Sequence, residues 1–184
     1  MSKTESTMLP LGTIAPNFEL DDVTSGSRIK LNDSQNRTGT VLMFLCNHCP
    51  YVKHINSGIT QLSNDYLPKK IRFIAISSND VNNHPEDSPD NMIQTARDNQ
   101  YPFPYLFDET QEVAMAYNAA CTPDFYVYND KLALIYRGQF DDSKPGNTIP
   151  VTGSSIRNAL EYLINKTPLN KIQKPSLGCS IKWK

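Results

Sequence analysis

The sequence lacks any apolar run that approaches the ~20 residues needed to cross a lipid bilayer. Its first eight residues, MSKTESTM, also lack the apolar segment of a secretory signal peptide. These absences predict a cytoplasmic protein with no membrane partner. In a reducing compartment, cysteines serve catalysis or metal binding more often than structural disulfides.

The sequence also lacks a strong charge of either sign, since 18 basic and 19 acidic residues leave a formal net charge of -1. No overall field therefore points to nucleic acid as a partner. The exception is local, because residues 167–184 contain four lysines and no acid. We expect this basic tail to pack on or beside the domain, since so few charges rarely make a nucleic-acid arm.

The chain has no internal repeat, and its 184 residues suit one domain with a sizeable core. We expect a flexible arm over residues 1–10, the domain over residues 11–166 and the basic tail over residues 167–184.

Two apolar runs, residues 41–45 and 71–76, are typical of strands buried on both faces. The segment between them repeats apolar residues at steps of three and four, which predicts an amphipathic helix; these residues are Val52, Ile55, Ile59, Leu62 and Tyr66. A strand, a helix and a strand at this spacing form a βαβ unit with parallel strands.

The remaining patterns complete one α/β domain. Residues 18–20 and 28–31 predict an N-terminal β-hairpin, and residues 125–128 and 132–136 predict a second one. A helix should begin at Pro89, residues 105–107 should form a short edge strand, and residues 110–117 a short helix. A last amphipathic helix should end before Pro168.

The main chemical signal is Cys46-Asn47-His48-Cys49, at the junction of a buried strand and a helix. The first turn of a helix presents unpaired N–H groups and a partial positive charge, which lower the pKa of a nearby thiol. We expect Cys46 at the cap, pointing outward, with Cys49 one turn further on. In this interpretation Cys46 attacks a disulfide and Cys49 resolves the mixed intermediate.

Two neighbours of the pair have candidate supporting roles. A protonated His48 would stabilise the Cys46 thiolate, although an exposed loop histidine without a role fits the sequence equally well. Pro50 suits the first helical turn, because the N–H that it lacks would be unpaired there.

A metal site is the competing interpretation. Cys46, Cys49 and Cys121, with His48 or His54, would supply four ligands suitable for zinc. A closed zinc site usually brings a second tight pair, and the sequence has no second CxxC and no HxxxH. We therefore predict redox chemistry and no metal.

Cys121-Thr122-Pro123 precedes a predicted strand, where Pro123 is a candidate cis-proline. Cys121 lies two residues before this proline and could come within reach of the other sulfurs. Cys179, in the tail, could act as a resolving cysteine. Either of these two cysteines could equally be inert.

With these motifs the chain resembles the thioredoxin superfamily, nearest to its peroxiredoxin-like branch of alkyl hydroperoxide reductases and thiol-specific antioxidant proteins. The resemblance covers residues 11–163 and includes Gly12-x-x-Ala15-Pro16-x-Phe18-x-Leu20, residues 46–50, Ser78-Asn79-Asp80, Thr122-Pro123 and Arg137-Gly138. It implies a thioredoxin-like fold, a central mixed sheet flanked by helices, with the hairpin as an N-terminal extension.

The resemblance also implies site roles. Pro123 would be cis, and its loop, with Thr122, would hold substrate beside Cys46. In a peroxidase variant Cys49 would be the peroxidatic cysteine, Cys46 would take the place of the family's threonine, and Arg137 could stabilise the thiolate. A structural role for Arg137 at a strand end is the alternative.

The sequence departs from thioredoxin itself, since Leu45 stands where a tryptophan would precede the first cysteine, and no proline separates the pair. We predict a thiol–disulfide oxidoreductase, a monomer or homodimer, that needs no cofactor. Its partners would be a protein or small-molecule disulfide and a dithiol reductant. The alternatives are a thiol peroxidase acting on a hydroperoxide through Cys49, and a zinc-binding or interaction module whose cysteines never cycle.

Overall fold

The computed structural model describes residues 3–33, 36–169 and 172–184. Its strands are β1 (Lys3–Glu5), β2 (Glu19–Asp22), β3 (Arg28–Lys30), β4 (Gly39–Phe44), β5 (Ile71–Ser77), β6 (Tyr105–Phe107), β7 (Cys121–Thr122), β8 (Asp124–Asn129), β9 (Leu134–Gly138) and β10 (Leu177–Ser180). Its helices are α1 (Pro50–Tyr66), α2 (Pro89–Asp98), α3 (Glu112–Ala116) and α4 (Ser154–Asn165), with short 3-10 turns η1 (Leu31–Asp33), η2 (Leu67–Lys69) and η3 (Pro85–Asp87).

Seven strands form the central mixed sheet, in the order β3-β2-β6-β5-β4-β8-β9. β4 pairs in parallel with β5, and α1 connects them, so the predicted βαβ unit is confirmed. β8 runs antiparallel on the other side of β4, and β9 follows it as a hairpin. A second, smaller sheet has the order β1-β10-β7.

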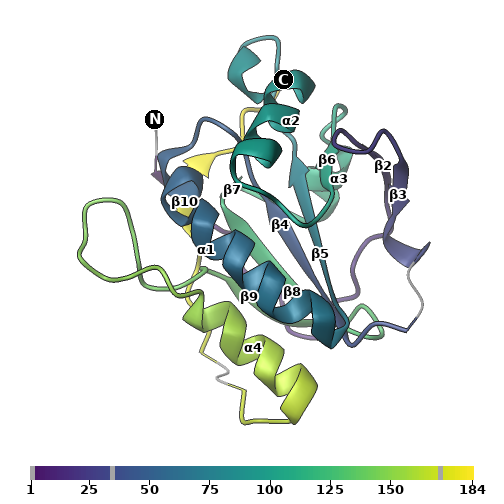
Figure 1. Ribbon diagram of the computed structural model, residues 1–184, viewed down its shortest axis with the longest axis vertical. Helices are drawn as coiled ribbons and strands as arrows, with labels where there is room; N and C mark the ends of the chain where they lie inside the picture. The colour runs from purple at the N-terminus through teal and green to yellow at the C-terminus, as the bar shows by residue number, and fades with distance from the viewer. Residues whose placement is uncertain (1–2, 34–35, 170–171) are drawn as a thin grey trace.

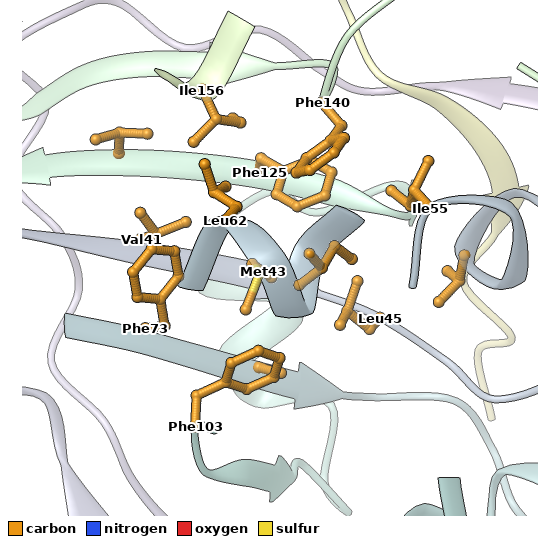
Figure 2. Packing of buried hydrophobic residues seen from close by; sticks show 14 of the residues in the cluster. Val41, Met43, Leu45, Ile55, Leu62, Phe73, Phe103, Phe125, Phe140 and Ile156 are labelled. Atoms are coloured by element: carbon orange, nitrogen blue, oxygen red, sulfur yellow. The ribbon is translucent and has the colours of Figure 1, made fainter. Parts of the chain in front are cut away.

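The central strand β4 supplies both cores, because successive side chains of a strand point to opposite faces. Val41 and Met43 join the cluster beneath α1, α2 and α4, whereas Leu42 and Phe44 join the cluster on the other face. Figure 1 shows α1 lying across one face of the sheet, and Figure 2 shows the apolar side chains that fill the space between them. The cysteine loop follows this buried strand directly.

Helix α1 forms on the predicted stripe, with Val52, Ile55, Ile59, Leu62 and Tyr66 all buried. Pro50 is its first residue, as expected for a residue without an N–H to satisfy. The helix ends at Tyr66, and Pro68 follows in η2. The stripe fixes which face of α1 meets the sheet, and so fixes where its N-terminus lies.

The sequence interpretation was wrong about the position of β6. Residues 105–107 were expected at the edge of the sheet, but β6 lies between β5 and β2. The N-terminal hairpin β2–β3 pairs onto it and becomes the new edge. Propensity and periodicity indicate that a short strand exists and do not indicate which neighbour will cover it.

Both chain ends contain a short strand that the sequence patterns did not predict. Within the arm, Lys3–Glu5 form β1, and within the tail, Leu177–Ser180 form β10. β10 lies between β1 and β7 and pairs antiparallel with both. Both terminal segments are therefore anchored beside the loop that carries Pro123.

Within the described residues, none of the helices combines the length and apolar character needed to cross a membrane.

Candidate redox site

The Cys46–Cys49 loop connects the end of β4 to the start of α1. Cys49 is the N-cap residue of α1, and Pro50 begins the helix. The expectation that Cys46 would cap the helix and point outward was therefore wrong. The helix begins one turn later than expected, and both cysteines are buried, with Cys46 1% and Cys49 0% exposed.

The loop that carries Pro123 packs against both sulfurs. The Thr122–Pro123 peptide bond is cis, as predicted. The Cys46 Sγ lies 3.1 Å from Thr122 Oγ1, and the Cys49 thiol, when protonated, donates to the Thr122 carbonyl oxygen at 3.2 Å. Thr122 therefore contacts each cysteine through a different group.

The two thiols of the CxxC pair have opposite pKa shifts. A hydrogen bond from Cys46 is the main cause that lowers the pKa of Cys49 to about 5, although burial opposes it. A hydrogen bond from Cys179 and the backbone N–H groups of Val52 and Cys179 also lower this pKa. Because Cys46 keeps its proton to donate this hydrogen bond to Cys49, its own pKa is raised, and burial and the charge of Asp87 raise it further. The pair thus holds one thiolate, centred on the sulfur at the helix N-terminus.

Asp87 fixes the shape of the cysteine loop through hydrogen bonds. One carboxylate oxygen accepts the backbone N–H of Asn47 at 2.7 Å and that of His48 at 3.3 Å. The other lies 2.7 Å from His48 Nδ1 and accepts Asn79 Nδ2 at 2.7 Å. The carboxylate is fully buried, so these contacts replace its lost hydration.

The side chain of His48 contacts Asp87 and His84. Its ring contacts Asp87 and stacks on His84 with the ring centroids 5.6 Å apart. The structure thus gives His48 a partner that the sequence interpretation did not name.

Cys179 brings a third sulfur into the site. It lies on β10 directly opposite Thr122 of β7, and its Sγ is 2.8 Å from the Cys49 Sγ. Burial, followed by the neighbouring Cys49, raises the pKa of Cys179 to about 12. The tail therefore holds this thiol inside the site.

Cys121 is directed elsewhere. Its thiol donates a long, weak contact to the Pro123 carbonyl oxygen at 3.8 Å. Burial raises its pKa above that of an ordinary thiol. Cys121 thus lies beside this loop, and its thiol is directed at the Pro123 carbonyl oxygen and not at the three clustered sulfurs.

Arg137 is held by groups other than thiols. Its guanidinium donates to Asp124 at 2.9 Å and to the Asn118 carbonyl at 2.8 Å, and lies over the Tyr126 ring at 4.5 Å. Arg137 and Asp124 are both fully buried. These contacts fit the structural role for Arg137. None of them is with the Cys49 thiolate.

The described residues contain one group with metal-ligand geometry: Cys46, His48 and Asp87, whose ligand atoms lie within 4.8 Å of one another. This set differs from the zinc set considered from the sequence. His54 lies elsewhere, with its Nε2 2.7 Å from Ser143 Oγ. The Asp87 oxygens are already occupied by four contacts, so a metal would have to displace some of them.

Asp87 and the contact between Cys49 and Cys179 were not identified from the sequence. A signal for Asp87 existed, because the carboxyl ends of the parallel strands β4 and β5 meet at one edge of the sheet. Polar residues after β5 therefore approach the cysteines that follow β4. No comparable signal placed Cys179, since its pairing spans 130 residues.

A family model named AhpC/TSA matches residues 11–137, more than half of the chain. The chain belongs to the AhpC/TSA family. The resemblance stated from the motifs is thereby confirmed, and this AhpC/TSA family member is an oxidoreductase of the thioredoxin superfamily. A search of curated proteins found no match.

Solved structures share the fold of this chain. An uncharacterised conserved protein from Geobacillus kaustophilus is 56% identical, with a TM-score of 0.97, covering 100% of this chain and 97% of that one. A hypothetical protein from Sinorhizobium meliloti is 38% identical, with a TM-score of 0.95 and 98% of each chain covered. The thioredoxin domain of a thiol-disulfide oxidoreductase from Bacteroides vulgatus is 12% identical, with a TM-score of 0.63, covering 82% and 97%, and so shares the fold.

Proposed function

We propose that this AhpC/TSA family member is a thiol–disulfide oxidoreductase whose Cys46 and Cys49 cycle between dithiol and disulfide. The observation that carries the proposal is the hydrogen-bonded pair of thiols at the N-terminus of α1, packed against the cis-proline loop. Such a pair shares one proton, so a reactive thiolate exists at neutral pH without a cofactor.

In the proposed cycle, transfer of the shared proton from Cys46 to Cys49 places the thiolate on Cys46, beside the Thr122 hydroxyl. Cys46 attacks a disulfide of the substrate and forms a mixed disulfide, and the first substrate sulfur leaves as a thiolate that takes up the proton of Cys49. Cys49 then attacks Cys46 and releases the second substrate thiol. The Cys46–Cys49 disulfide is reduced again by an external dithiol.

The substrate in this proposal is a protein or small-molecule disulfide. Thr122 and the following cis peptide bond form the surface against which it docks. Cytoplasmic location and a monomeric or homodimeric state remain predictions from the sequence.

Peptide mapping of the purified, metal-free protein tests the proposal. Trypsin leaves Cys46 and Cys49 on one peptide, residues 38–53. Mild oxidation should make this peptide two hydrogens lighter, and a dithiol should restore it. Cys46→Ser and Cys49→Ser should each abolish the change and the reduction of a model disulfide. Failure to form any disulfide, or stoichiometric zinc in the purified protein, would overturn the proposal.

One observation favours a second candidate, a thiol peroxidase acting through Cys49. The thiolate rests on Cys49 and not on Cys46, so attack on a hydroperoxide needs no prior proton shift. The sulfenic acid formed would be resolved by a neighbouring thiol. Peroxide should then convert Cys49 to a sulfinic acid in Cys46→Ser/Cys179→Ser, and leave Cys49 unmodified if the enzyme only exchanges disulfides.

A further inference from the structure

Strand β10, which carries the sulfur of Cys179, is held in place beside the CxxC pair by several backbone contacts. The strand is paired on both sides, with Cys179 opposite Lys3 of β1 and opposite Thr122 of β7. The backbone N–H of Lys182, just beyond it, donates to Asn79 Oδ1 at 2.9 Å. These contacts hold Cys179 from three directions while its Sγ lies 2.8 Å from Cys49 Sγ.

Gly178 permits this close approach. A Cβ atom added at Gly178 would lie 1.9 Å from the Thr122 carbonyl oxygen and 2.6 Å from its carbon. Any other residue here would push β10 away from β7 and move Cys179 with it. The absence of a side chain therefore sets the distance between the two sulfurs.

We propose that Cys179 is a third redox thiol. It attacks Cys49 in the Cys46–Cys49 disulfide and forms a Cys49–Cys179 disulfide in its place. This inference rests on the function proposed above and extends it from two thiols to three. The two sulfurs, 2.8 Å apart, need to approach by only about 0.8 Å to reach the 2.03–2.05 Å of a disulfide bond.

The exchange balances without an added oxidant. Cys179 loses its proton to solvent, and its thiolate attacks Cys49 Sγ. A Cys49–Cys179 bond forms, the Cys46–Cys49 bond breaks, and Cys46 leaves as a thiolate that takes up a proton. The number of disulfides stays at one, so nothing is oxidised or reduced overall.

Oxidation of the first pair prepares Cys179 for this step. In the reduced protein, the hydrogen bond and the charge of Cys49 contribute to the raised pKa of Cys179. Burial, the main cause of the raised pKa, remains when Cys49 enters a disulfide, but the two contributions of Cys49 disappear and the charge of Lys182, which lowers this pKa, stays. The Cys179 thiolate thus becomes more available when there is a disulfide to attack.

The exchange would return Cys46 to the thiol state beside Thr122 while the oxidising equivalent is stored between α1 and β10. The enzyme could then engage a second substrate before an external reductant resets it. Cys121 provides the contrast, because its thiol contacts the Pro123 carbonyl oxygen, and it should stay reduced throughout.

Tryptic peptides distinguish these disulfides. Cys46 and Cys49 lie on residues 38–53, Cys121 on residues 98–131, and Cys179 on residues 172–182, because Lys174 precedes a proline that blocks cleavage. A Cys46–Cys49 disulfide stays within one peptide, whereas Cys49–Cys179 joins two. The full chain is oxidised with one equivalent of diamide, quenched in acid, alkylated and mapped.

Cys46→Ser should give the 38–53/172–182 cross-link and lose two of its three remaining thiols. Wild type should show this cross-link beside the intrapeptide disulfide, and the control Cys121→Ser should behave as wild type does. An intrapeptide disulfide in wild type with no cross-link in Cys46→Ser overturns the inference and leaves the proposed function intact. Absence of both disulfides from wild type overturns both.

Discussion

At the scale of single residues, the site depends on polar groups that hold the cysteine loop in place. Asp87 accepts two backbone N–H groups of that loop and lies against His48 and Asn79. Its negative charge also raises the pKa of Cys46. One buried carboxylate thus holds the shape of the loop and contributes, after the hydrogen bond to Cys49 and burial, to keeping the proton on Cys46.

We predict that Asp87→Asn lowers the free energy of unfolding by about 1–3 kcal/mol, because an amide cannot accept all four contacts of a buried carboxylate. The pKa of Cys46 should fall as well, since the nearby negative charge is lost. Urea denaturation and the pH profile of mixed-disulfide formation measure these effects. The neighbouring exposed residue gives the control, Glu86→Gln, and equal stability of the two variants would contradict the prediction.

The thiolate of Cys49 gives a second prediction at this scale. A pKa lowered from 9.0 to about 5 means that the thiolate persists at neutral pH and is protonated as the pH falls through about 5. The ultraviolet absorbance of thiolate in the reduced protein should follow this titration. Cys49→Ser should lose the signal, and Cys121→Ser should keep it. A titration centred near 9.0 in the reduced wild type would refute the assignment.

At the scale of elements, β10 and the cis-proline loop behave as one unit, because Gly178 lets the strand lie against Thr122. The sulfur of Cys179 follows the backbone of this strand. Movement of β10 should therefore change the redox site although the strand lies far from the cysteine loop in the sequence.

We predict that Gly178→Ala displaces β10 and lowers the yield of the Cys49–Cys179 cross-link at least tenfold. The matched control is Gly146→Ala, where a Cβ meets open space and only the positive φ of 92° costs stability, by about 1–2 kcal/mol. Cross-link yield in a Cys46→Ser background and thermal unfolding provide the measurements. Equal yields in the two variants would show that the close approach at Gly178 is unimportant.

The elements around the CxxC loop could be predicted from the sequence, because local patterns specify them. The apolar runs of β4 and β5, the stripe of α1 and the proline after Thr122 each depend on neighbouring residues. The position of β6 in the sheet, the strands at both chain ends and the pairing of Cys49 with Cys179 depend on residues far apart in the chain. Periodicity carries no information on such partners, and helix α1 begins at Pro50 where the cap was expected at Cys46.

At the scale of the whole molecule, stability depends on a charged pair inside the sheet. Arg137 of β9 and Asp124 of β8 are both fully buried and lie 2.9 Å apart. Burial, opposed by Arg137, raises the pKa of Asp124 to about 6. Removal of one partner leaves the other charge without compensation.

We predict that Arg137→Met lowers the free energy of unfolding by about 3–5 kcal/mol, and that Arg137→Met/Asp124→Leu recovers most of this loss. The exposed pair of Lys174 and Asp142 supplies the control, because Lys174→Met should cost at most about 1 kcal/mol. Urea denaturation measures all three. A folded Arg137→Met protein should keep the Cys49 titration, and loss of that titration would restore Arg137 as a thiolate stabiliser.

The distance along the chain between Cys49 and Cys179 has a consequence for biosynthesis. A ribosome that adds about 5–20 residues per second needs roughly ten seconds to make the 130 residues that separate them. Strands β5 to β9 are made within that interval, so Cys46 and Cys49 can meet an oxidant before Cys179 exists. A nascent chain could thus form only the Cys46–Cys49 disulfide, and the Cys49–Cys179 disulfide would become possible when β10 docks.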